Sequence, residues 1–120
     1  MSIGAQIEKF YSEAIENQYL WFAEFPDETA LEFDVAEGNV SFPIWSSKSR
    51  ILRLKKLSPD ILGGAEPRGI SWEGFKEHVV PVLTSRNRPA NLNLSGKNLT
   101  GFDLPLEQLI RNFEGSSHGS

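Results

Sequence analysis

Cysteine is absent from this 120-residue sequence, and histidine occurs only as His78 and His118. The lack of thiols excludes disulfide bonds and thiolate chemistry. Metal sites need clustered histidines, cysteines or carboxylates, so we expect no bound metal and no cofactor. A Ser-His-Asp triad could use only His78 within the folded part, and no serine lies in a G-x-S-x-G motif. We therefore interpret His78 as a solvated helix residue and predict no catalytic residues.

Long apolar runs are also missing from the sequence. A helix that spans a bilayer needs roughly 20 consecutive apolar residues, so no membrane span is predicted. The first ten residues, MSIGAQIEKF, lack the basic and apolar regions of a secretory signal. We therefore expect a cytoplasmic protein without a membrane partner.

Positive charge is scarce in the first part of the chain. Residues 1–46 contain one basic residue, Lys9, and nine acidic residues, whereas the whole chain has 12 basic and 16 acidic residues. The resulting net charge of −4 argues against non-specific binding to nucleic acid. We therefore predict no nucleic-acid partner.

The acidic residues are concentrated in one segment that contains no basic residue. Its members are Glu24, Asp27, Glu28, Glu32, Asp34 and Glu37. Side chains two residues apart in a strand point to the same side, so the charges of Glu32 and Asp34 should add. This segment is our candidate for binding a basic protein partner. The alternative is that its charges only keep an exposed sheet edge soluble.

The spacing of apolar residues predicts an α+β fold, with a small, mostly antiparallel sheet and three to four helices packed on it. Helical periodicity predicts helices over 3–17, 47–57, from Trp72 onward, and 104–113. Alternation and turn residues predict strands over 19–25, 30–35, 40–45, 68–70, 90–94 and 99–102. We expect a single domain over residues 1–114, followed by a low-complexity, disordered tail over 115–120.

Three local features refine this prediction. Pro81 should kink or end the helix that starts at Trp72. Residues 95–98 should form the turn of a hairpin between the last two strands. LSGKNLT has Asn91 where a phosphate-binding loop needs its first glycine, and Asn98 after the lysine, so we reject such a loop.

The stretch SFPIWSSKSRILRLKK, residues 41–56, joins a strand to a basic helix. Ser46 or Ser47 stands where a helix N-cap belongs, and we interpret these serines as caps rather than as nucleophiles. The Lys/Arg side chains of residues 48–56 could contact phosphates or an acidic partner. A solvated helix face is the simpler interpretation of these charges.

Several motifs together resemble a known family. They are FYSEA at residues 10–14, PIWSSKSR at 43–50, ISWEGF at 70–75 and NLSGKNLTGFD at 93–103. In this order they resemble the uncharacterised bacterial family catalogued as domain of unknown function 2750, over roughly residues 5–113. The resemblance implies a small cytoplasmic bacterial protein and no established catalytic residues.

These observations favour a non-enzymatic protein-binding module of a bacterial cell. Its most concrete form is an immunity or antitoxin-like inhibitor that binds a toxin domain through the acidic segment. The alternative is a small-ligand-binding or enzymatic domain that uses a polar cluster of Trp45, Ser47, Arg50 and Asn93. The abundant carboxylates leave carboxylate catalysis open, and the sequence does not determine the oligomeric state.

Overall fold

A computed structural model describes residues 3–34, 40–95 and 100–118, and it confirms the predicted α+β fold. The first half contains α1 (Ile3–Asn17), β1 (Tyr19–Glu24), β2 (Phe33–Asp34), β3 (Val40–Ile44), α2 (Lys48–Leu57) and α3 (Pro59–Leu62). The second half contains β4 (Glu66–Ser71), α4 (Trp72–Gly74), the π-helical turn η2 (Phe75–Val79), α5 (Val80–Ser85), β5 (Ala90–Ser95), β6 (Thr100–Leu104) and α6 (Leu106–His118).

The strands form two small sheets that meet at one backbone contact. β1 pairs with β4, and the second sheet has the order β2-β3-β5-β6. All pairs are antiparallel except β3 with β5, so the sheet is mostly antiparallel as predicted. The two sheets are linked where Trp21 and Trp45 exchange backbone hydrogen bonds of 2.9 and 2.8 Å.

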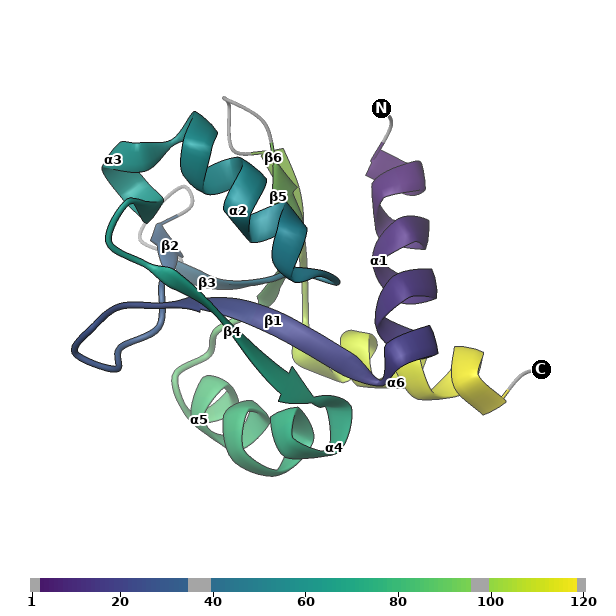
Figure 1. Cartoon of the computed structure of the whole chain (residues 1–120). Coiled ribbons are helices and arrows are strands. Elements are labelled where there is room, and N and C mark those ends of the chain that lie inside the picture. The colour runs from purple at the N-terminus through teal and green to yellow at the C-terminus, as the bar shows by residue number, and fades with distance from the viewer. Residues whose placement is uncertain (1–2, 35–39, 96–99, 119–120) are drawn as a thin grey trace.

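Helices cover the strands on both sides (Figure 1). α2 and α3 lie on one side of the crossing strands β1 and β4, and α4 and α5 lie on the other. The alternation of side chains along β1 follows this division. Leu20 packs in the core with α1, α5 and α6, whereas Ala23 packs in a second core beneath α2 and α3.

The sequence prediction differs from the structure in the bounds of several elements and did not include α3, and two of the differences bear on the site and the tail. The strand expected over 30–35 is reduced to Phe33–Asp34 among the described residues, because Leu31 donates its backbone N–H to Ala23 and Ala30 bridges Glu24. The last helix, α6, reaches His118 and so includes residues 115–118, which we assigned to a tail. β5 and β6 pair as expected, and residues 96–99 of their connection lie outside the described residues.

Pro81 does not end its helix, so one of the two expected outcomes, an early end, is wrong. The chain stays helical to Ser85, and the wide turn η2 precedes the proline. In this turn the N–H of Val80 donates to the carbonyl of Phe75, five residues earlier. An uninterrupted α-helix would rotate Leu83 about 80° away from Phe75. The wide turn reduces that rotation, so both residues can be buried in the same core.

Candidate functional site

Part of the acidic segment lines a cleft between the turn after β1 and the helical stretch η2–α5. Three carboxylates line one wall of this cleft, those of Glu24, Glu28 and Glu32. The cleft has a volume of about 470 Å³. We call it the acidic cleft. Pockets that bind small molecules or side chains usually measure about 300–1,000 Å³, so its size is adequate for a ligand.

The floor and far wall of the acidic cleft give it a mixed character. Phe22 and Phe42 lie on the floor, with their ring centroids 5.8 Å apart. The far wall carries His78, Arg86 and the exposed side chain of Val82. The cleft can therefore accept an apolar group on its floor and a cationic group against its glutamate wall.

Glu28 occupies a strained position in the turn that forms this wall. Its φ of 70° lies in the left-handed region, which is unfavourable for a residue other than glycine. The preceding Asp27 accepts hydrogen bonds from the hydroxyl and the N–H of Thr29, at 2.6 and 3.1 Å. These bonds hold the pKa of the Asp27 carboxyl below its usual value. Asp27 thus stabilises the turn, while Glu28 stays exposed beside the cleft.

Two of the three cleft carboxylates contact arginines from distant parts of the sequence. Arg88 donates through Nε to Glu32 at 3.1 Å, and Arg68 lies 3.6 Å from Glu24. The segment itself contains no basic residue, but the fold brings basic residues from elsewhere in the chain beside these two carboxylates. The side chains of Asp34 and Glu37 lie outside the described part of the structure. Of the three carboxylates, Glu28 is the exposed one, and Glu24 is the more loosely paired of the other two.

The structure brings the predicted polar cluster together but closes it with internal hydrogen bonds. Arg50 donates through Nε and Nη2 to the carboxylate of Glu13, at 3.1 and 3.0 Å. Trp45 is fully buried and donates through Nε1 to the carbonyl of Leu94 at 2.8 Å. The side-chain oxygen of Asn93 accepts a 3.0 Å bond from the N–H of Ser46. Each of these side chains already has a protein partner.

Glu13 is the central residue of this network, and the sequence analysis did not select it. It also accepts a 2.6 Å bond from the hydroxyl of Ser46. The bonds from Arg50, followed by the bond from Ser46, hold its pKa below the ordinary value although partial burial opposes the shift. Glu13 belongs to the FYSEA motif, so the resemblance pointed to its region without indicating its role.

Asn93 reaches the network because the backbone of β5 is irregular at this point. The pairing of β5 with β6 shifts register between Leu92 and Ser95, and Asn93 has a positive φ of 51°. Asparagine tolerates this left-handed conformation better than most residues. The resulting bulge directs the Asn93 side chain toward Ser46.

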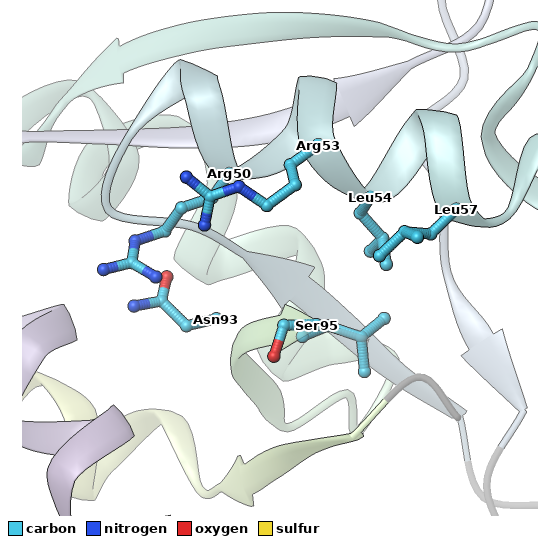
Figure 2. Close-up of a pocket in the computed structure, with 7 residues that line it drawn as sticks. Arg50, Arg53, Leu54, Leu57, Asn93 and Ser95 are labelled. Atoms are coloured by element: carbon cyan, nitrogen blue, oxygen red, sulfur yellow. The ribbon is translucent and has the colours of Figure 1, made fainter. Parts of the chain in front are cut away.

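The cavity beside Arg50 and Asn93 of this network is too small for a ligand larger than water. Figure 2 shows Arg50, Arg53, Leu54 and Leu57 of α2 opposite β5. The cavity between these elements measures about 30 Å³, which is roughly the volume of one water molecule. Arg50 and Asn93 therefore line no ligand-sized cavity between α2 and β5. Ser47 instead borders a separate open pocket of about 500 Å³, together with Ser46, Tyr19 and Trp21.

The two serines before α2 have different roles from those we predicted. Ser47 has the extended N-cap backbone, but its hydroxyl makes no capping bond and lies 3.2 Å from the hydroxyl of Ser49. Ser46 is buried and bonds to Glu13 and Asn93 instead. Ser47 is therefore the N-cap residue of α2, as we predicted. Neither serine hydroxyl forms the predicted capping bond to the helix.

Comparison of the chain with protein-family models, curated proteins and solved structures gives no significant match. The resemblance to an uncharacterised bacterial family therefore stays a prediction. Among the residues that the structure describes, no group of histidine and carboxylate side chains is arranged to hold a metal ion. Within the same residues, no helix has both the length and the apolar character needed to cross a bilayer.

Proposed function

We propose that this protein is a non-enzymatic binding module that holds a basic, partly apolar segment of a protein partner in the acidic cleft. The observation that carries this proposal is the convergence of Glu24, Glu28 and Glu32 on one cleft with an apolar floor. A segment that alternates apolar and basic side chains would place the former on Phe22 and Phe42 and the latter against the glutamates.

The loose contact of Glu24 with Arg68 favours such a partner. At 3.6 Å the pair is too long for a hydrogen bond, and the Arg68 side chain is 64% exposed. Exposed ion pairs contribute little to stability, typically about 0–1 kcal/mol. An arginine of the partner could therefore replace Arg68 at small cost and form a bidentate contact with Glu24.

The most concrete form of this function is an immunity or antitoxin-like inhibitor in a bacterial cytoplasm. Toxins that cleave nucleic acid present basic surfaces to their substrate, and a negatively charged wall speeds association with such surfaces. The alternative is a ligand-binding or enzymatic site around Trp45, Arg50 and Asn93. It is less favoured because each of these side chains already has a hydrogen-bond partner within the protein, and the cavity beside Arg50 and Asn93 measures only about 30 Å³.

A titration with two synthetic amphipathic peptides tests the proposal, one with leucine and arginine and the other with leucine and glutamate. In NMR spectra of the ¹⁵N-labelled protein, the arginine peptide should shift the amide signals of Glu28, Val79 and Val82. Glu28→Gln should weaken its binding several-fold, whereas Glu16→Gln on the exposed side of α1 should not. Equal binding of both peptides, or shifts confined to α2, would contradict the proposal.

A further inference from the structure

A second surface of the molecule combines exposed apolar and basic side chains. Leu52, Leu57 and Ile61 are large aliphatic residues that are 39%, 43% and 36% exposed. Arg53 and Lys56 of α2 are exposed as well, and Arg53 and Leu57 lie on the side of α2 that faces β5. We call Leu52, Arg53, Lys56, Leu57 and Ile61 the α2–α3 face.

The basic residues of this face differ from the other basic residues of α2. Arg50 is paired with Glu13, and Lys55 is paired with Glu66 at 2.8 Å. Within residues 3–34, 40–95 and 100–118, Arg53 and Lys56 form no ion pair. Their charges are therefore available to an acidic surface of another molecule.

We infer that the α2–α3 face of one copy of this chain binds the acidic cleft of a second copy. The face presents aliphatic side chains beside two cations that form no ion pair with the described residues. The cleft presents Phe22 and Phe42 beside Glu28 and the loosely paired Glu24, with Arg86 on the opposite wall. The exposed Val82, at the rim of the cleft, extends its apolar surface outward. Both the charge and the apolar character of the two surfaces are complementary.

The positions of the two surfaces determine the kind of assembly. The α2–α3 face and the helical wall of the acidic cleft lie on opposite sides of β1 and β4 (Figure 1). A chain therefore cannot place its own face in its own cleft. The contact joins two different patches, so each added copy leaves one free face and one free cleft. Such head-to-tail contacts give open chains, or rings where the rotation closes, and both assemblies become more populated as the protein concentration rises.

This inference does not depend on the proposed partner, although both use the acidic cleft. A partner segment and the α2–α3 face would compete for the same glutamates, and the partner would release monomers from the chains. The contact should be weak and sensitive to salt, because it relies on few exposed charges and a small apolar area.

Sedimentation equilibrium of the full chain tests the contact with two variants. The cleft variant Glu28→Lys keeps the α2–α3 face, and the double variant Lys56→Glu/Leu57→Ser keeps the cleft. We expect the wild type to exceed its monomer mass of 13.4 kDa increasingly at higher concentration. Each variant alone should stay monomeric, and their equimolar mixture should form a dimer that grows no further. Glu16→Lys and Arg111→Glu, two exposed charge reversals elsewhere, should associate as the wild type does.

The mixture also separates loss of binding from loss of folding, because only folded variants can complement each other. A wild type that stays monomeric at low salt, or a mixture that fails to form dimers, would overturn the inference. The inference would also be overturned if the wild type stayed monomeric but bound duplex DNA or anionic vesicles, and the double variant lost that binding. The α2–α3 face would then bind one of these molecules and not a second copy of the chain. Peptide binding to the cleft of a strictly monomeric wild type would leave the proposed function intact and refute only the self-contact.

Discussion

Glu28 combines a strained backbone conformation with a position in the wall of the acidic cleft. Its left-handed backbone would suit glycine, yet a glutamate stands there and its carboxylate lines the acidic cleft. Strained backbone positions are found preferentially at functional sites, because other interactions of the fold maintain them. The hairpin bond from the N–H of Glu28 to the carbonyl of Phe25, at 2.9 Å, helps to maintain this one.

Replacing Glu28 by glycine should therefore raise stability and lower binding. We expect the free energy of unfolding to increase by up to about 1 kcal/mol, because the strain of a left-handed residue is removed. Binding of the leucine–arginine peptide should weaken at the same time. Urea unfolding and peptide titration of Glu28→Gly measure the two effects, with Glu28→Gln as the variant that keeps the strain. A loss of stability in Glu28→Gly would show that the turn does not carry this strain.

Glu13 makes stability dependent on pH in the acid range. Its pKa is lowered in the folded protein by Arg50 and then by Ser46, so its ionised form favours folding. The contribution is complete above the ordinary value of 4.5 and is lost as the pH falls through the lower folded-state pKa. Hydrogen bonds to charged groups contribute roughly 1.5–3 kcal/mol, so Glu13→Gln should cost about that much at pH 7.

The difference in stability between the wild type and Glu13→Gln should accordingly shrink below about pH 4.5, the ordinary value of this carboxyl. Thermal unfolding of both proteins between neutral and acid pH measures it. Glu16→Gln, on the exposed side of the same helix, is the control and should follow the wild type at every pH. A pH-independent difference would mean that the carboxylate of Glu13 is not the titrating group.

At the scale of elements, the start of α2 depends on Ser46 and not on the serine at its N-cap position. Ser46→Ala removes a partner of both Glu13 and Asn93 inside the fold, and we expect it to cost about 1–3 kcal/mol. Ser47→Ala removes a hydroxyl without a capping bond and should change stability by less than about 0.5 kcal/mol. Chemical unfolding of the two variants compares them directly, and equal losses would restore the cap interpretation.

The bulge in β5 offers a second test at this scale. Asn93→Gly keeps the freedom to adopt a positive φ but removes the acceptor of the Ser46 N–H, which should cost about 1–3 kcal/mol. Asn93→Ala removes the same acceptor and adds the strain of a left-handed alanine, roughly 1 kcal/mol more. Urea unfolding should therefore rank wild type above Asn93→Gly and Asn93→Ala last. The reverse order of the two variants would mean that the bulge straightens when the asparagine is lost.

Elements with a regular apolar pattern could be predicted from the sequence, whereas features that depend on distant contacts could not. The spacing of apolar residues placed α1 and α2, and Trp45 was recognised at the end of its strand. The wide turn before Pro81 lets both Phe75 and Leu83 lie in the first core, and this match to distant core residues is not visible in the local sequence. Likewise, the pairing of Glu32 with Arg88 joins residues 56 positions apart, so the acidic segment alone could not reveal it.

At the scale of the whole molecule, two hydrophobic cores share one pair of central strands. Phe113 stacks on Trp72 in the first core, with ring centroids 3.8 Å apart, and Leu54 lies with Trp45 in the second. The cores are joined by the contact of Glu13 in α1 with Arg50 in α2 and by the backbone bonds between Trp21 and Trp45. Neither core can be exposed without breaking these bonds, so we expect the domain to unfold as one cooperative unit.

Truncation of either core should therefore destabilise both to the same extent. Phe113→Ala and Leu54→Ala should each cost about 2–5 kcal/mol, since each removes a fully packed side chain. In urea titrations followed by NMR, the indole signals of Trp45 and Trp72 report the second and the first core. Their transitions should coincide in the wild type and shift together in each variant. If Phe113→Ala moved only the Trp72 transition, the cores would unfold separately, and the Glu13–Arg50 contact could not be the link that couples α1 to α2.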